Sequence, residues 1–347
     1  MKKKTVTIED IAKEADVSAA TVSHVINKTR FVNDNTAKRV NEIIKKRGYL
    51  RNSSQKKLVQ RGWSSKLIGL IVNDSYNPLF AFISREIELL ADKIGYSVIM
   101  CNTNRNTDNE IRYINTLIAR KVDGVIIVAT QEKKENFNNL LRYKIPFVLI
   151  ERKIKDLETD AVMGDRYNAA IKAVDYLAKL GHERIAFINS DSHLYNSQLR
   201  MQGFIKGLKK NNLDFKQDLI LENGGYWPKD GYVQAQKIFN MIERPTAIIA
   251  HNDLLAMGII RAIQDRNLNV PNDFSVLGFD NLFIDDYFHP RITSITYRKK
   301  DIANNCLSIL IKRIEGDKGK PEEIMLDLQL VIRESTGPCK AESRFFS

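Results

Sequence analysis

The chain has 347 residues, 43% of them hydrophobic, which is long enough for a small module and a separate two-lobed body. Its formal net charge of +12 is concentrated at the start, where residues 1–62 hold 15 Lys and Arg against 6 Asp and Glu, while the rest hold 39 against 36. This distribution argues against a generally basic protein and favours a nucleic-acid-binding module over the alternative of a lysine-rich solvated surface.

Two short helical patterns with a tight break between them follow the first six residues. Thr7 is placed to cap the first helix, whose apolar residues recur at helical spacing from Ile8 to Ala15. Ser18 is the cap candidate of the second helix, in which the apolar positions are 22, 25 and 26. The pair predicts a helix-turn-helix whose second helix lies in the DNA major groove, and the alternative is an ordinary small helical hairpin.

The residue string favours the first interpretation. Residues 10–27 read D-I-A-x-x-A-x-V-S-x-x-T-V-S-x-V-I-N, which resembles the DNA-binding headpiece of the LacI/GalR family of bacterial transcription repressors. The chemistry of the second helix suits base contacts, since alanine methyl groups can contact thymine methyl groups and an imidazole can donate to a purine acceptor. We expect DNA contacts from Thr7, Ser18, Ala19, Ala20, Thr21, Ser23, His24, Asn27, Arg30 and Leu58, with Ala19, Ala20 and His24 reading bases.

A third helix and a linker complete the predicted headpiece. Asn33 or Asn35 can cap this helix, Val40 and its helical neighbours face inward, and Gly48 ends it. We therefore place the headpiece at residues 1–50 and the linker at 51–62. Family members usually carry Pro-Asn-x-x-Ala-Arg-x-Leu in this linker, as a hinge helix whose leucine enters the minor groove. Here Arg51 replaces the proline, and we expect Leu58 to act as the wedge, the alternative being a solvated flexible linker.

From residue 64 onward, strand-length apolar runs alternate with helical patterns in two similar rounds. This alternation predicts α/β architecture, with two doubly wound parallel sheets whose ligand sites face each other across a cleft. The segments 181–187, 252–258 and 278–281 also resemble the family and, through it, the periplasmic sugar-binding proteins. The expected parallel strands are 66–73, 96–102, 125–129, 146–150, 184–189, 219–222, 246–250 and 275–279.

The predicted body is a periplasmic-binding-protein-like domain at residues 63–338. We assign residues 63–163 and 294–325 to lobe 1, residues 164–293 and 326–338 to lobe 2, and residues 339–347 to a tail without a recognised counterpart.

Polar and aromatic residues near the strand ends are the candidates for effector binding. A sugar needs carboxylate, amide and guanidinium groups for its hydroxyls and an aromatic ring for its apolar face. The resemblance implies effector contacts at Arg200, Asn252 and Asp280; Glu151-Arg152 stands where many relatives have Asp-Arg, and Tyr297 where the sugar-binding proteins often have Gln. The full candidate set is Asp74, Phe80, Arg152, Arg200, Asn252, Asp280 and Tyr297.

Several of these candidates have a structural alternative. Asn252 and Asp280 are also placed to cap helices, Phe80 to fill the core, and Arg152 to pair with Glu151 or Asp160. His182, in a Gly-His-Glu-Arg segment before a strand, is expected to be structural.

Other classes of protein find little support. The apolar runs are too short to span a membrane, and the start of the chain lacks the apolar region of a secretion signal, so we expect a cytoplasmic, nucleoid-associated protein. The three cysteines are far apart, which excludes a disulfide framework. Because phosphate-binding, dinucleotide-binding, serine-hydrolase and zinc-protease motifs are absent, we expect no catalytic residue, metal or cofactor.

The sequence therefore predicts a homodimeric, operator-binding transcription regulator, more specifically a repressor, controlled by a small effector that is a sugar. One alternative keeps the fold but replaces the sugar by a purine or a phosphoprotein co-repressor. The other is a cytoplasmic sugar-binding protein without operator specificity.

Overall fold

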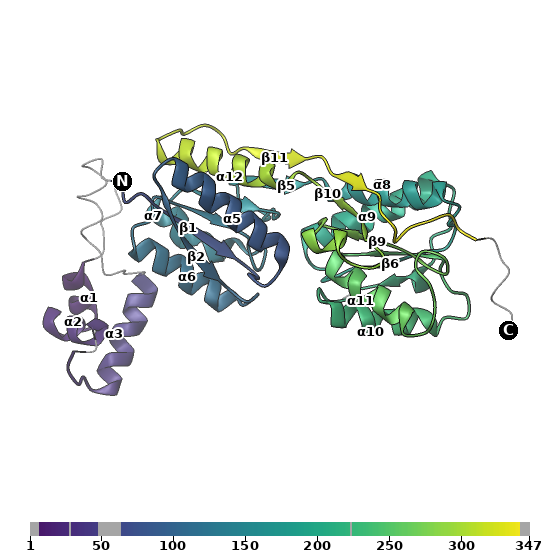
Figure 1. Cartoon of the computed structure of the whole chain (residues 1–347). Helices are drawn as coiled ribbons and strands as arrows, with labels where there is room; N and C mark the ends of the chain where they lie inside the picture. Colours follow the sequence, from purple (N-terminus) through teal and green to yellow (C-terminus); the bar gives the residue numbers. More distant parts are fainter. Residues whose placement is uncertain (1–6, 28, 48–63, 223, 341–347) are drawn as a thin grey trace. The chain divides into compact units, whose positions relative to one another are not determined.

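The computed structural model describes residues 7–27, 29–47, 64–222 and 224–340, and the chain forms two compact units, residues 1–64 and 65–347 (Figure 1). The predicted linker 51–62, with its wedge Leu58, lies outside the described residues, as does Gly48.

The first unit contains the three predicted helices, α1 (Ile8–Glu14), α2 (Ala19–Asn27) and α3 (Asp34–Arg47). Thr7 and Asp10 form a capping box, in which the Asp10 amide donates to the Thr7 hydroxyl at 3.2 Å and the Thr7 amide donates to the Asp10 carboxylate at 2.8 Å. The Ser18 hydroxyl accepts from the Thr21 amide at 3.0 Å, which confirms Ser18 as the cap of α2. Ile11, Val22 and Val40 close a small core.

The second unit contains two six-stranded sheets, each covered by helices on both faces. The first sheet has the strand order β11-β5-β4-β3-β1-β2, and all its described pairings are parallel. Helices α5 and α12 pack together on one face, and α6 and α7 cover the other (Figure 1). The strands are β1 (Leu67–Val72), β2 (Ser97–Asn102), β3 (Gly124–Ile127), β4 (Phe147–Ile150), β5 (Asp160–Gly164) and β11 (Glu323–Leu326), and the helices are α5 (Pro78–Lys93), α6 (Thr107–Ala119), α7 (Asn138–Tyr143) and α12 (Lys299–Ile314).

The second sheet repeats this plan with the order β12-β10-β9-β8-β6-β7, and only β12 runs antiparallel to its neighbour. Helices α8 and α9 pack against each other on one face, as do α10 and α11 on the other. The strands are β6 (Ile185–Ile188), β7 (Ile220–Leu221), β8 (Ala247–Ala250), β9 (Ser275–Phe279), β10 (Thr293–Thr296) and β12 (Gln329–Val331), and the helices are α8 (Arg166–Lys179), α9 (Tyr195–Lys210), α10 (Pro228–Phe239) and α11 (Asp253–Gln264).

The chain crosses between the two sheets three times, after β5, after β10 and between β11 and β12. Since β10 belongs to the second sheet, residues 294–296 belong to lobe 2, and the expected start of the returning lobe 1 segment at residue 294 is corrected to a point after Thr296. The eight predicted parallel strands are all present, whereas the short strands β5, β10, β11 and β12 were not predicted.

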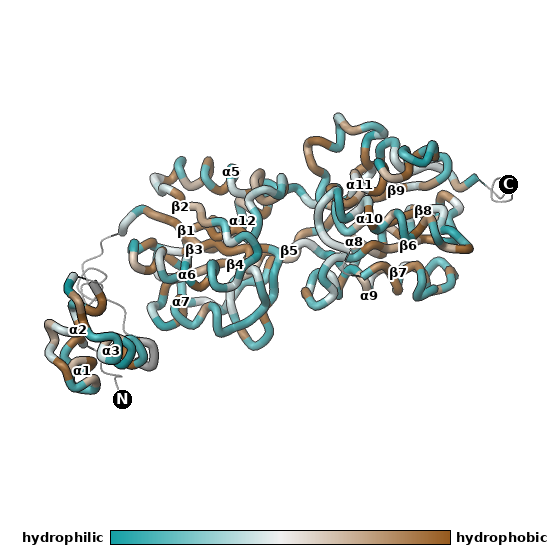
Figure 2. Tube along the Cα trace, turned by 90° about the horizontal axis from the view of Figure 1, so that it is seen from below, coloured by the Kyte–Doolittle hydropathy of each residue, from teal (hydrophilic) through white to brown (hydrophobic). Residues whose placement is uncertain are grey.

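Continuous apolar strands form the centre of both lobes. In Figure 2 the strands are mostly brown, flanked by helices that are teal on their outer sides. Every residue of β3, β4, β6 and β8 is buried, as expected for parallel strands covered on both faces. No helix among the described residues is both long and apolar enough to cross a membrane.

His182 is structural, as predicted, and ties the C-terminal segment to lobe 2. Its Nδ1 lies 2.9 Å from the Thr246 hydroxyl, and its Nε2 lies 3.0 Å from the Ser275 hydroxyl and 3.1 Å from the Gly337 carbonyl. Because a carbonyl only accepts, Nε2 carries a proton. Burial favours the neutral ring, in which Nδ1 accepts from the Thr246 hydroxyl. Burial lowers the pKa of His182 below its ordinary value, although the Gly337 carbonyl opposes the shift.

We expect a pH-dependent loss of stability from this residue. A pKa lower in the folded chain means that the unfolded chain binds more protons below pH ~6.5, so the contribution of His182 is complete above that pH and declines as the pH falls. The free energies of unfolding of the wild type and the His182→Gln variant can both be measured in urea. The difference between them should shrink by up to about 1.4 kcal/mol for each pH unit below pH ~6.5. A wild-type-to-variant difference that is constant from pH 7.5 to 5.5 would contradict this.

Candidate functional site

Helix α2 presents a surface of small side chains. Ala20 and Ser18 are exposed, and Ala19, Thr21, Ser23 and His24 are half-buried at the surface. Thr7 and Arg30 are exposed too, whereas the side chain of Asn27 is outside the described residues. The residues that we expected to contact DNA, as far as they are described, therefore lie at the surface of the first unit.

The polar members of this surface are already oriented by neighbours. His24 Nδ1 lies 2.8 Å from the Thr29 hydroxyl, which fixes the imidazole on α2. The hydroxyls of Ser18 and Thr21 lie 2.9 Å apart. Phe31, which we did not predict as a contact, is 92% exposed in the loop after α2, and a bulky aromatic after a basic residue in a turn was the available signal.

Glu151 is the centre of a buried hydrogen-bond network between the lobes. It follows β4, and its Oε1 accepts from the Gly164 amide at 3.0 Å. Its Oε2 accepts from Arg166 through Nε at 3.0 Å and Nη2 at 2.9 Å, and from Asn196 Nδ2 at 3.1 Å. Burial is the largest single influence and lowers the pKa of Arg166, but the charges of Glu151, Tyr297 and Asp280 and the hydrogen bond to Glu151 together outweigh it, and the net shift is upward. Both carboxylate oxygens therefore have partners in the chain, so Glu151 serves as an interlobe anchor.

Arg152, Arg200 and Asp280 lie around this anchor. Arg152 Nη1 donates to the Glu151 carbonyl at 2.8 Å, and its Nε is 4.0 Å from Glu132. Arg200 extends from α9 with its guanidinium over the Phe279 ring, 4.8 Å from the centroid. Asp280 follows β9, and its carboxylate is 3.8 Å from Arg166 Nη1.

These groups are buried and incompletely paired. Arg152 Nε, Arg166 Nη1 and Arg200 Nε are buried without a hydrogen-bond partner. Burial, together with the charge of Arg166, lowers the pKa of Arg200 to about 9. Burial raises the pKa of Asp280, while Arg166, Arg200 and Lys299 oppose that shift. Unpaired buried donors are costly, so this cluster is suited to a ligand that brings oxygen acceptors and hydroxyl donors.

The remaining candidates have other partners. Asn252 caps α11 by accepting from the Leu255 amide at 2.8 Å, and it donates to the Tyr226 carbonyl at 3.1 Å. In the first lobe, Asp74 accepts from Arg105 at 3.2 Å, and Phe80 is a core residue of α5. Tyr297, at the crossing after β10, is 4% exposed and belongs to the buried cluster: the Arg166 guanidinium lies 5.4 Å from its ring centroid, and its hydroxyl has no hydrogen-bond partner among the described residues. Asp160, a predicted alternative partner of Arg152, pairs instead with Arg313 at 2.9 Å.

Contacts across the lobes involve residues that the sequence did not single out. The Tyr76 and Trp227 rings have centroids 5.0 Å apart, and the Arg105 guanidinium lies 3.8 Å from the Tyr226 centroid. The Tyr195 amide, at the start of α9, donates to Glu132 at 3.1 Å. These contacts place the two lobes in close apposition around the buried cluster.

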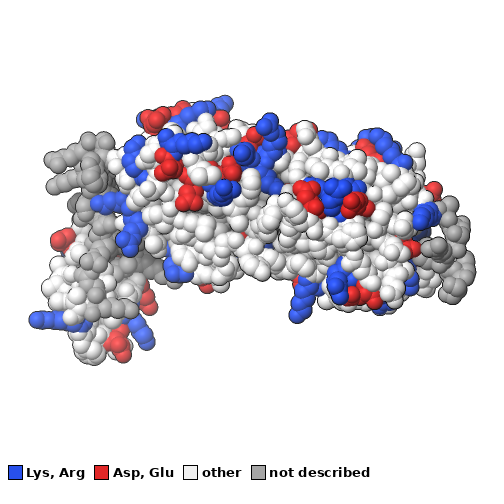
Figure 3. Space-filling view, in the orientation of Figure 1, with Lys and Arg blue, Asp and Glu red and all other residues white. Residues whose placement is uncertain are grey.

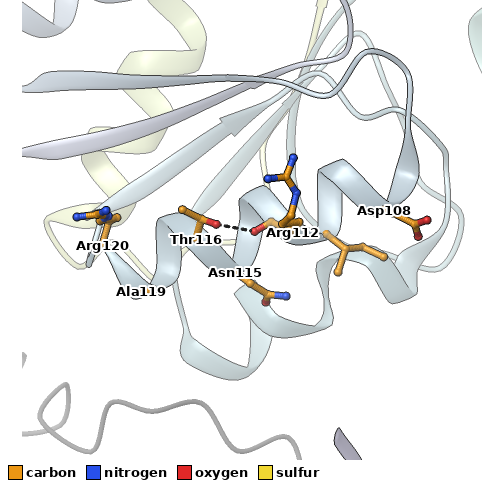
Figure 4. Close-up of a pocket in the computed structure, with 7 residues that line it drawn as sticks. Asp108, Arg112, Asn115, Thr116, Ala119 and Arg120 are labelled. Atoms are coloured by element: carbon orange, nitrogen blue, oxygen red, sulfur yellow. Dashed lines mark hydrogen bonds between the residues drawn. The ribbon is translucent and has the colours of Figure 1, made fainter. Parts of the chain in front are cut away.

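A hollow of 790 Å³ lies on one face of α6, away from this cluster (Figure 4). It is lined by one helix and its C-terminal cap, and the Thr116 hydroxyl in it donates to the Arg112 carbonyl at 2.9 Å. A second hollow, of 290 Å³, lies beside Tyr297 and Lys299. Neither has the converging buried charges of the cluster, and no group of three metal-ligating side chains is placed for a metal among the described residues.

On the face of the body seen in Figure 3, charged side chains are mixed in sign and are not gathered at one place, unlike the charges of the buried cluster. Figure 3 shows Lys and Arg interspersed with Asp and Glu over the face of the body in view. On the face in view, charges of both signs are therefore mixed, in line with the near-neutral composition of residues 63–347.

A helix-turn-helix unit followed by a two-lobed body with a polar interlobe cluster defines a class of ligand-controlled DNA-binding regulators. Comparison with known proteins agrees: residues 7–52 match the family of bacterial regulatory proteins, lacI family, and residues 174–336 match the periplasmic binding protein-like domain. The chain belongs to the LacI family of bacterial regulators.

Relatives and solved structures match most of the chain. A protein of Mannheimia succiniciproducens named HTH-type transcriptional repressor PurR is 34% identical over 330 residues, 95% of this chain and 98% of the relative. A LacI family regulator from Enterococcus faecium with bound ribose is similar with a TM-score of 0.72 and 28% identity, covering 79% of this chain and 100% of that one. A regulator from Alkaliphilus metalliredigens complexed with D-xylulofuranose has a TM-score of 0.69 and 28% identity, covering 78% and 99%.

Proposed function

We propose that this chain is a transcriptional repressor that binds a specific operator as a homodimer and is controlled by a sugar held between its lobes. The observation that carries the effector assignment is the convergence of Arg152, Arg200 and Asp280 with unpartnered donors in a buried site. Guanidinium and carboxylate groups in this arrangement match the acceptor and donor sides of sugar hydroxyls. A repressor acts on the chromosome, so we place the protein in the cytoplasm.

The operator assignment rests on α2 and the surface around it. One helix-turn-helix reads one half-site, so two copies related by a two-fold axis would bind a roughly palindromic operator. Ala19, Ala20 and His24 would contact bases, Thr7, Ser18, Thr21, Ser23, Asn27 and Arg30 would position the helix, and Leu58 would enter the minor groove. Phe31 is a further candidate for contact because it is exposed beside Arg30.

The effector would act by shifting the relative populations of two lobe arrangements. The three crossings are the points where the lobes can move against each other. The buried cluster links the two lobes through the hydrogen bonds of Glu151 to Gly164 and Asn196. A ligand that prefers one arrangement changes operator affinity by its differential binding, typically about 1–3 kcal/mol.

A purine is the second candidate effector, favoured by the relatives named PurR and by the Tyr76–Trp227 aromatic pair. A panel of D-ribose, D-xylose, D-galactose, hypoxanthine and guanine separates the two, with tryptophan fluorescence and thermal shift as readouts. A response to a sugar but to neither purine supports the proposal, and the reverse result replaces the sugar by a purine.

The operator half of the proposal is tested by DNA selection. The full chain should enrich one palindromic sequence from random DNA, with an affinity that falls steeply with salt, whereas a chain of residues 65–347 should bind the selected DNA at least ~1,000-fold more weakly. No enrichment together with a shallow salt slope would instead favour a sugar-binding protein without operator specificity.

A further inference from the structure

His251 is a buried polar residue that sequence reasoning did not assign to the effector site. It follows β8, directly before the cap of α11, and is 9% exposed. Arg200 Nη1 lies 2.7 Å from His251 Nε2 and 2.9 Å from His251 Nδ1. Nε2 also lies 3.0 Å from the Ser190 hydroxyl, and Nδ1 lies 3.2 Å from Asn189 Oδ1. The imidazole therefore contacts the guanidinium of a predicted effector-binding arginine directly.

The neighbouring hydrogen bonds fix the protonation of this ring. Asn189 Nδ2 donates to the Ser197 carbonyl at 3.1 Å and its Oδ1 accepts from the Ser190 amide at 3.1 Å, so Oδ1 is an acceptor. His251 Nδ1 must then carry the proton and donate to Asn189, which leaves a lone pair on Nε2. Arg200 Nη1 is near both ring nitrogens, and because Nδ1 donates to Asn189, Nε2 is the one that can accept from the guanidinium. The Ser190 hydroxyl, which also faces Nε2, has the Ser197 hydroxyl at 3.2 Å as another partner.

The surrounding charges hold the ring in its neutral form. Besides Arg200 on α9, it is influenced by Arg166 at the start of α8, Arg152 after β4 and Arg105 before α6, while the Tyr226 ring lies edge-on with its centroid at 5.6 Å. Burial, followed by these four arginines, lowers the pKa of His251 well below its ordinary value. A protonated ring would add a fifth cation and would remove the acceptor of Arg200.

A neutral partner has a consequence for Arg200 that a carboxylate would not have. A carboxylate hydrogen-bonded to the guanidinium would cancel its charge, whereas the imidazole fixes its orientation and leaves the charge available. Phe279 covers one face of the guanidinium, and Arg200 Nε is buried without a partner. Arg200 Nε can therefore still donate to an oxygen atom of a ligand.

We propose that His251 is a positioning residue, which holds Arg200 ready for an acceptor oxygen of the effector while leaving its positive charge uncancelled. This inference rests on the effector site proposed above and deepens it. It separates two roles in the cluster: Arg200 contacts the ligand, and His251 acts through Arg200.

Two replacements of His251 distinguish positioning from simple packing, with D-ribose as the probe and the full chain in calorimetry. His251→Leu removes the acceptor and should weaken D-ribose binding by at least tenfold. In His251→Gln the side-chain oxygen can accept from Arg200, so binding should recover to within about threefold of wild type. His182→Gln is the matched control, since it alters another buried neutral histidine of the same lobe away from Arg200, and it should bind D-ribose as the wild type does.

The ring itself gives a second readout that does not depend on a ligand. Nitrogen-15 spectra of the histidine side chains, with the His251 signal assigned by its loss in His251→Gln, should show a neutral ring protonated on Nδ1 from pH 7.5 to 5.5. An imidazolium or an Nε2–H ring overturns the inference. So does a His251→Leu variant that binds D-ribose as tightly as wild type, or a His251→Gln variant as weak as His251→Leu.

The two proposals fail in different ways. If the wild-type chain does not bind D-ribose or any other sugar of the panel, the proposed sugar effector is wrong. The ring signals then decide the inference alone: the Nδ1–H neutral form supports it, and any other form overturns it.

Discussion

Replacement of Glu151 by alanine is expected to lower the free energy of unfolding of the body by about 3–5 kcal/mol. The carboxylate accepts hydrogen bonds from Gly164, Arg166 and Asn196, and the side chains of Glu151 and Arg166 are each 3% exposed. Removing it leaves the buried Arg166 guanidinium with only the more distant Asp280, at 3.8 Å, as a counter-charge, and leaves the Gly164 amide without its acceptor. Asn196 keeps one acceptor, the Glu151 main-chain carbonyl at 2.8 Å. The cost of these orphaned groups exceeds the modest net value of the pair itself.

Urea denaturation of matched variants measures this cost. Glu151→Met combined with Arg166→Met should lose less stability than Glu151→Ala alone, because the guanidinium that would lose Glu151 is removed as well, while Asp280 keeps the nearby charges of Arg200 and Lys299. Lys153→Ala is the surface control: its ion pair with Glu323 is about half exposed on both sides at 2.8 Å, and the expected loss is only about 0–1 kcal/mol. If the free energy of unfolding of Glu151→Ala were within about 1 kcal/mol of the wild-type value, the hydrogen bonds of Glu151 would stabilise the body less than we infer.

The use of Glu151 as an anchor changes how the effector site is understood. From the resemblance alone, the Glu151-Arg152 pair looks like a conservative variant of the Asp-Arg found in relatives. Both oxygens of Glu151 are taken up by the first crossing and by α9, so the carboxylate that remains for a ligand is that of Asp280. We expect the effector contacts to fall mainly on Asp280, Arg152 and Arg200.

Most of the parallel strands could be predicted because strands buried on both faces consist of short, continuous runs of apolar residues. Val125 to Ile127, for example, is buried on both faces and has no polar interruption. Strands β11 and β12 escaped prediction because none of their residues is buried, β11 alternating between exposed and half-buried positions and β12 having one exposed and two half-buried residues. Their pairing also depends on the way the chain returns between the lobes. Their short lengths added no further signal.

The members of the buried cluster were predicted in part. Arg200 and Asp280 were found because the resemblance and the strand ends point to them. Arg166, Asn196 and His251 were not, because each lies at a helix start or strand end whose partner is distant in sequence. Asp165-Arg166 directly after a strand was the available local signal, and only the crossing brings this arginine to Glu151.

The close packing of α8 on α9 sets the distance between two of these arginines. Arg166 begins α8, and Arg200 extends from α9 one turn before Gly203. A Cβ atom on Gly203 would lie 2.2 Å from the Tyr167 carbonyl oxygen and 2.9 Å from the Ala170 Cβ. Because the first of these neighbours is backbone, it cannot give way without moving a helix.

Gly203→Ala is therefore expected to lower the free energy of unfolding by about 2 kcal/mol, since overpacking of up to about 3 kcal/mol is offset by a gain of about 1 kcal/mol in helix propensity. By displacing Arg200 from Arg166, it should also weaken D-ribose binding at least tenfold in calorimetry. Gly319→Ala is the control, because this glycine is exposed and the nearest atom to its Cβ would be the end of the flexible Asp317 side chain, at 3.2 Å. Stability and affinity equal to wild type in Gly203→Ala would mean that the helices are not held this closely, and the geometry of the cluster would have to be revised.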